Sequence, residues 1–141
     1  MIYGTQEFYD LVKEKANSDE RYLKKAKGLT VKFQNLLMDC PGDVDRLVDW
    51  GLTEGKVTSV KLQESPAPSA WRTAPLRPDY FLRTIGKYET YVKLNKEEIT
   101  PGQGQETGAF RIMGDLSKIM AKIATFTAFT DLIATIPVEY E

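Results

Sequence analysis

The chain has 141 residues, of which 42% are hydrophobic and 28% are charged. These are the proportions of a globular protein, and the length fits a single domain over residues 1–141 that buries a core of its own. The 19 basic and 20 acidic residues leave a net charge of −1. Such a balance argues against nucleic acid as a partner, because no overall positive field attracts it.

The chemistry that the chain can carry is narrow, because it has no histidine and one cysteine, Cys40. This removes the usual ligands of zinc, copper and iron, as well as nucleophiles activated by histidine. No aspartate-rich loop suggests a calcium or magnesium site. We therefore expect no metal, no cofactor and no enzymatic activity. The first residues do not form a secretory signal, and no segment is apolar enough to span a bilayer, so a cytoplasmic protein is expected.

Two helices are expected at the start of the chain. Thr5 can cap the first, and Ser18 can cap a second, shorter helix that ends at Gly28. The apolar residues of the first helix recur at the spacing of one helical face: Phe8, Leu11, Val12 and Ala16. Both helices therefore have one side available for a core.

After these helices, the spacing of the apolar residues changes from that of a helix to the alternation of a strand. Residues 29–34, at the start of a strand expected over 29–38, alternate apolar and polar side chains, as do 44–52 and 57–62, and turn residues separate the three segments at 40–43 and 54–55. This pattern predicts an antiparallel meander of three strands. After a proline-containing connector at 65–69, residues 70–74 alternate again and predict a fourth strand.

The second half is expected to begin with two helices. Pro78 suits the first turn of one that ends at Gly86 and carries Tyr80, Phe81, Leu82 and Ile85, and a second apolar stripe follows over 88–95. Residues 98–108 are rich in glycine and polar side chains, which predicts a loop. Residues 109–113 then predict the last strand.

An apolar tail follows Asp115, which can cap a helix. A first stripe consists of Leu116, Ile119, Met120 and Ile123. A second stripe is out of phase with it and consists of Phe126, Phe129, Leu132, Ile133 and Ile136. The change of phase predicts a break near 125–127 and gives the tail two apolar faces. Such stripes most often form plain core, and the alternative is that one face lines a cavity.

Two segments together resemble a known family. Residues 107–115, Thr-Gly-Ala-Phe-Arg-Ile-Met-Gly-Asp, are similar to the Ser-Gly-x-apolar-Lys-apolar-x-Gly-Asp signature of sterol carrier protein 2-like domains. The hairpin at 52–57, Leu-Thr-Glu-Gly-Lys-Val, also resembles one in that family. The resemblance implies an α/β (α+β) fold with a five-stranded, mainly antiparallel sheet covered by helices. It also implies a tunnel for a fatty acid, acyl-CoA or sterol, which the C-terminal helices cover.

The chain departs from the family at 102–106, where Gly-Gln-Gly-Gln-Glu replaces the small and apolar residues of a short helix. One wall of the tunnel is therefore expected to be more open than in the family. For an anionic head group, the candidates near the junction of strand and helix are Arg72, Arg77 and Arg83. The alternative for these arginines is a solvated surface.

The leading hypothesis is non-enzymatic binding or transfer of a hydrophobic ligand, a fatty acid, acyl-CoA or sterol-like lipid, in an apolar tunnel. The predicted ligand-binding residues are Phe81, Ile85, Ile119, Met120, Ile123, Phe126, Phe129 and Ile133. The alternative is a protein-interaction or dimerisation module, for instance a homodimer, in which side chains fill the core. An enzyme would need a buried Asp or Glu that faces a pocket, and the sequence nominates none.

Overall fold

The structure is a computed structural model that describes residues 1–141. It begins with helix α1, Gln6–Ser18, and helix α2, Glu20–Ala26. Thr5 caps α1 as predicted, because its side chain accepts a hydrogen bond from the Phe8 backbone N–H. The cap predicted at Ser18 is wrong. Asp19 caps α2 instead, since the Ser18 hydroxyl donates back to carbonyls of the last turn of α1.

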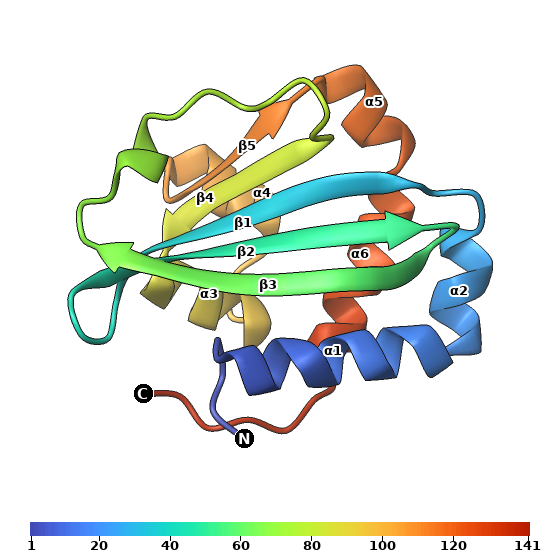
Figure 1. Ribbon diagram of the computed structural model, residues 1–141, viewed down its shortest axis with the longest axis horizontal. Helices are drawn as coiled ribbons and strands as arrows, with labels where there is room; N and C mark the ends of the chain where they lie inside the picture. Colours follow the sequence, from blue (N-terminus) through green and yellow to red (C-terminus); the bar gives the residue numbers. More distant parts are fainter.

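Five strands form one sheet, in the spatial order β3-β2-β1-β4-β5 (Figure 1). Their bounds are β1 Val31–Cys40, β2 Val44–Thr53, β3 Lys56–Pro66, β4 Leu82–Lys87 and β5 Phe110–Gly114. Neighbours pair antiparallel except β1 and β4, which are parallel. The predicted five-stranded, mainly antiparallel α+β fold is therefore confirmed, together with the three-stranded meander.

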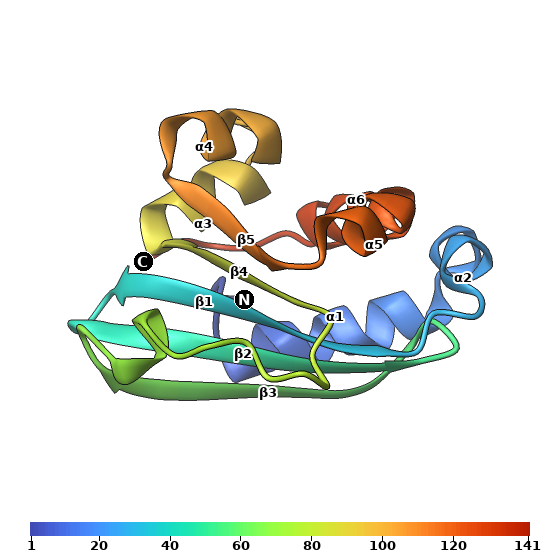
Figure 2. The same ribbon diagram turned by 90° about the horizontal axis from the view of Figure 1, so that it is seen from above.

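The remaining helices all lie on one side of this sheet (Figure 2). They are α3 Tyr88–Asn95, α4 Pro101–Thr107, α5 Leu116–Ala121 and α6 Ile123–Ala134. Figure 2 also shows α3 and α4 stacked at one end of the sheet and α5 and α6 at the other. None of the helices has the length and apolar character required to cross a bilayer.

The two faces of the sheet bury different amounts of apolar surface. The helix-covered face carries the main core, which contains Phe33, Trp50 and Leu82 from the strands. On the opposite face, Leu36, Leu47 and Ile85 form a small separate cluster that is partly covered by Trp71. Trp71 belongs to the short 3-10 helix Ala70–Arg72 in the connection between β3 and β4.

The fourth strand is not where the sequence predicted it. Residues 70–74 contain the 3-10 turn, and the strand is β4, in the region predicted as a helix from Pro78 to Gly86. Strand β4 is an inner strand, and its side chains are buried on both faces of the sheet, Leu82 in the main core and Ile85 in the opposite cluster, so no polar alternation marks it. Gly86 fits because an added Cβ would lie 3.1 Å from the Ala109 carbonyl oxygen.

The predicted loop over 98–108 is also wrong, because residues 101–107 form α4. Thr100 and Gln103 make a reciprocal capping box, Pro101 occupies the first turn, and Gly108 ends the helix at φ 78°. Gly104 lies against Phe110 of β5, where a Cβ would come within 2.8 Å of the Phe110 Cβ. The short helix that the family resemblance implied is therefore present, although its side chains are polar.

The apolar tail breaks earlier than predicted. Asp115 caps α5 by accepting a hydrogen bond from the Lys118 N–H, as expected. The break falls at Lys122 rather than at 125–127, and α6 begins at Ile123 without a side-chain cap. The second helix therefore starts three residues before its first aromatic ring, Phe126.

Candidate functional site

A layer of aromatic rings joins α6 to the sheet. Phe33 of β1 and Trp50 of β2 stack with their centroids 5.7 Å apart and an interplanar angle of 9°. Phe129 of α6 meets both rings edge-on, at 5.1 Å from Trp50 and 6.0 Å from Phe33. Side chains therefore fill the space between the middle of α6 and the sheet.

This layer ends at two half-buried rings. Phe126 meets Phe33 edge-on at 5.4 Å, and on its other side it stacks on Phe81 at 5.8 Å and 21°. Phe81 immediately precedes β4, and its backbone N–H donates to the Lys32 carbonyl at 2.7 Å. Phe81 and Phe126 are thus the outermost rings of a continuous aromatic surface.

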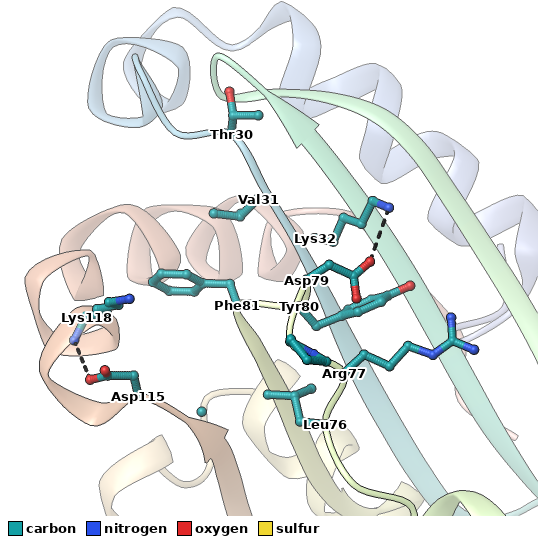
Figure 3. Close-up of a pocket in the computed structure, with 12 residues that line it drawn as sticks. Thr30, Val31, Lys32, Leu76, Arg77, Asp79, Tyr80, Phe81, Asp115 and Lys118 are labelled. Carbon is teal, nitrogen blue, oxygen red and sulfur yellow. Dashed lines mark hydrogen bonds and ion pairs between the residues drawn. The ribbon is translucent and has the colours of Figure 1, made fainter.

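A pocket of about 410 Å³ opens beside Phe81 (Figure 3). Three segments form it, the start of β1, the chain before β4, and the turn from β5 into α5. The residues that line it are Thr30, Val31, Lys32, Leu76, Arg77, Pro78, Asp79, Tyr80, Phe81, Gly114, Asp115 and Lys118. In Figure 3 the Phe81 ring points toward the helix that carries Lys118.

The charged side chains of the pocket do not cancel one another. Asp79 pairs with Lys32 at 3.6 Å, and Asp115 is occupied as the cap of α5. Arg77 and Lys118 form no ion pair in the structure. Asp115 keeps its negative charge as a cap, so three cations (Lys32, Arg77 and Lys118) and two acids leave the pocket lining with a net charge of +1, which favours an anionic group.

Polar contacts on the opposite face of the sheet fix the segment before β4. The Tyr80 hydroxyl donates to Asp49 at 2.8 Å, and burial together with this carboxylate raises the pKa of Tyr80 to about 12. Arg83 is buried, and its guanidinium donates to Gln34 and to the Ala74 carbonyl. Burial lowers the pKa of Arg83. These contacts hold in place the segment before β4, which forms one side of the pocket.

Asp45 of β2 also holds the start of the connection between β3 and β4 in place. This fully buried carboxylate accepts hydrogen bonds from the Ser69 N–H and hydroxyl and from the Arg72 guanidinium, which also reaches Asp39. Burial alone raises the pKa of Asp45. The hydrogen bonds from Arg72 and Ser69 outweigh that effect and hold the pKa well below its ordinary value.

The structure brings together only some of the predicted ligand-binding residues. Phe81 lines the pocket and Phe126 stacks on it. Ile119 and Phe129 are fully packed, and Ile133 is half-buried against the same core. None of these three residues lines the pocket, and neither do Ile85, which lies on the opposite face of the sheet, or Met120 and Ile123, which are exposed.

The three candidate arginines also separate. Arg72 is held by Asp45 and Asp39, and Arg83 is buried with Gln34, so neither is available to a head group. Arg77 alone lines the pocket. Val31, Leu76 and Asp79 also line the pocket, and no local sequence pattern identifies them as site residues. Residues 76–81 come close to β1 only because β1 pairs with β4.

A second pocket, of about 380 Å³, lies at the start of α1. Its lining is polar apart from Leu62, and Arg46 within it already pairs with Glu64 at 3.2 Å. The structure places no three His, Cys, Asp or Glu side chains together in a way that could hold a metal ion. The pocket beside Phe81 is therefore the stronger candidate for a hydrophobic ligand.

No known protein-family profile and no curated protein sequence matches the chain. Solved structures share its fold. A crystal structure of sterol carrier protein 2 superposes with a TM-score of 0.75 at 13% identity, over 94% of this chain and 98% of the other.

Two more structures extend this comparison. A conserved hypothetical protein of Thermus thermophilus matches with a TM-score of 0.74 at 14% identity, over 96% of this chain and 90% of its own. The sterol carrier protein-2 like-3 of Aedes aegypti matches at 0.53 and 17% identity, over 89% and 98%. The chain therefore has the sterol carrier protein 2-like fold, as the sequence resemblance implied.

Proposed function

We propose that this protein binds a single-chain lipid with an acidic head group and carries it without chemical change. One observation carries the proposal, the continuity between the open pocket and the aromatic layer through Phe81 and Phe126. The pocket volume of about 410 Å³ falls within the range of small-molecule sites, roughly 300–1,000 Å³. The shared fold with sterol carrier proteins supports a hydrophobic ligand.

The acyl chain is proposed to lie along Phe81 and Val31 and to reach Phe126. Burial of each methylene contributes about 0.8 kcal/mol, so a few carbons against these side chains suffice for measurable binding. The start of α6 is the part of the cover that can yield, because it lacks a side-chain cap and Ile123 and Ala124 are exposed. Deeper entry would displace Phe126 before it disturbs the packed Phe129.

The head group is proposed to meet the free cations of the rim. Figure 3 shows Arg77 and Lys118 on different sides of Phe81, so each is tested separately. A carboxylate gains from either cation, whereas an uncharged sterol or ester does not. A competition experiment therefore distinguishes a fatty-acid ligand from the sterol-like alternative. If the site recognises fatty acids by their charge, methyl esters should compete less well than the free acids.

Replacing Phe81 by Ser is expected to weaken binding of cis-parinaric acid at least tenfold, because a large apolar side chain contributes about 1.5–3 kcal/mol when its contact is buried. The measurement is a fluorescence titration in vesicle-free buffer. Arg77→Glu and Lys118→Glu should each weaken palmitic acid as a competitor more than they weaken methyl palmitate.

Trp71→Ser is the matched control, since Trp71 is also a half-buried aromatic residue but lies on the opposite face of the sheet. It should leave the titration unchanged. Equal affinity of wild type and Phe81→Ser, in proteins that unfold at the same urea concentration, would move the ligand away from this pocket. Absence of saturable binding to folded wild type would reject the proposed function itself.

A protein-interaction or dimerisation module is the second candidate. The observation that favours it is the exposure of Leu116, Met120 and Ile123, because monomeric proteins seldom leave neighbouring large apolar side chains uncovered. Sedimentation at several protein concentrations tests it. A dimer that Met120→Ser dissociates would support this candidate.

A further inference from the structure

Helix α5 and the first residue of α6 leave apolar side chains in solvent. Leu116 is 65% exposed, Met120 63% and Ile123 42%. Ile119 is the one buried residue of α5, so the helix is attached to the body along a single side. These three exposed side chains, which we call the apolar tip, are not used by the pocket beside Phe81.

Basic side chains surround the apolar tip. Helix α2 contacts α6, and the Thr125 hydroxyl donates to the Lys25 carbonyl at 3.0 Å, which brings the end of α2 to the start of α6. The pocket rim adds cations from β1 and from the segment before β4. The basic residues at this end are Lys24, Lys25, Lys27, Lys32, Arg77, Lys118 and Lys122. The acidic residues of the same elements are Glu20 at the start of α2, Glu54 in the adjoining hairpin, Asp79 and Asp115.

The charged residues are distributed unevenly over the molecule. The whole chain has a net charge of −1, so an excess of lysines at one end leaves the rest of the molecule with an acidic excess. Of the acids at this end, Asp79 pairs with Lys32 and Asp115 caps α5. The lysines of the α2 end and of α5 form no ion pairs in the structure, so their charge is available to an outside partner.

We infer that the apolar tip and the lysines around it dock this protein on the surface of an anionic lipid bilayer. A bilayer offers an apolar layer a few ångströms beneath a negatively charged surface, and the tip with its basic surroundings matches both. Lysine stems lie along apolar surface while their ammonium groups stay at the level of the head groups.

A second copy of the chain fits this end less well than a membrane does. In a twofold dimer the same surface meets itself, so the lysines of one copy would face those of the other. Their repulsion opposes the contact, whereas phosphate and carboxylate groups of anionic lipids attract it. The inference goes beyond the proposed function, because the apolar tip and the lysines of the α2 end lie outside the pocket proposed for the bound lipid.

Flotation of the full chain with vesicles tests the docking. Vesicles of equimolar phosphatidylcholine and phosphatidylserine should bind the protein at low salt, and vesicles of phosphatidylcholine alone should bind it at least about tenfold more weakly. Raising the salt concentration should release it, because screening shortens the reach of surface charges. The double variant Leu116→Ser/Met120→Ser should lose binding by about tenfold or more.

Charge variants outside the pocket separate docking from ligand binding. Lys25→Glu/Lys122→Glu should reduce vesicle binding at least about tenfold, while Lys61→Glu/Lys93→Glu, the same charge change on β3 and α3, should change it far less. Neither pair should alter cis-parinaric acid binding in vesicle-free buffer, which tests the pocket on its own. No association with the mixed vesicles at low salt overturns the inference, as does a dimer that the Leu116→Ser/Met120→Ser variant abolishes.

Discussion

Replacing Phe129 by Ala is expected to lower the free energy of unfolding by about 3–5 kcal/mol. The Phe129 ring is 4% exposed and contacts the rings of Tyr22, Phe33 and Trp50. Its removal opens a cavity between α6 and the sheet in the most densely aromatic part of the core. Urea unfolding followed by tryptophan fluorescence measures the loss, provided that far-UV circular dichroism shows a folded variant.

Met120→Ala is the control for this substitution. Met120 lies one helix away and is 63% exposed, so its truncation should change stability by no more than about 0.5 kcal/mol. A cost below about 1 kcal/mol for Phe129→Ala would mean that the ring lines an open space rather than packed core. In that case the cavity would extend beneath the middle of α6, as the sequence predicted.

Replacing Asp45 by Asn is expected to cost about 3–5 kcal/mol at neutral pH, because it leaves the Arg72 guanidinium and the Ser69 groups without their shared carboxylate. The loss should also free the connection between β3 and β4. Asp131→Asn, an exposed carboxylate on α6 without a hydrogen-bonded partner in the structure, should be nearly neutral.

The same substitution has a defined pH dependence. Because the pKa of Asp45 is held well below its ordinary value in the folded state, the stabilisation is complete above the unfolded pKa of about 3.9. It is lost as the pH falls below that value toward the folded pKa. The stability difference between wild type and Asp45→Asn should therefore be constant from pH 7 to about 5 and shrink below about 4. A difference that grows on acidification would contradict the assignment.

The meander and the first helices could be predicted because each has one solvated side. Strand β3, the start of β1 and the second half of β2 alternate polar and apolar residues where one face looks outward, and α1 repeats its apolar residues once per turn. Strand β4 lacks such a side, because its side chains are buried on both faces of the sheet, Leu82 in the main core and Arg83 and Ile85 on the opposite face. Its pattern depends on partners distant in sequence, so the local signal of Pro78 favoured a helix.

Glycine content misled the prediction of α4 for a different reason. Glycine is a poor helix former in isolation, yet Gly104 is required by contact with Phe110 and Gly108 by its left-handed cap. The local signals for this helix, Thr100 before Pro101 and Gln103 at the third position, were present in the sequence. The glycine-rich, polar composition of residues 98–108 outweighed these helix signals and led to the prediction of a loop.

The candidate site could be predicted only in part. Phe126 was identified from the apolar surplus of the tail and Phe81 from the apolar residues of the predicted helix at 78–86, and the two rings are adjacent in the structure. Ile85 was grouped with Phe81 on a predicted helix over 78–86. In the structure Phe81 precedes β4 and lies against the main core, whereas Ile85 within β4 packs on the opposite face of the sheet. The free cations of the rim depend on which charges find partners, which only the three-dimensional arrangement decides.

Photo-crosslinking tests the proposed lipid site most directly. A palmitic acid analogue with a diazirine near the end of its chain would be bound to the wild-type protein, irradiated and located by peptide mass spectrometry. The proposal predicts saturable labelling, competed by palmitic acid, within residues 76–81 and 114–126. Labelling that palmitic acid does not compete, or that falls on the opposite face of the sheet around Leu36, Leu47 and Trp71, would contradict it.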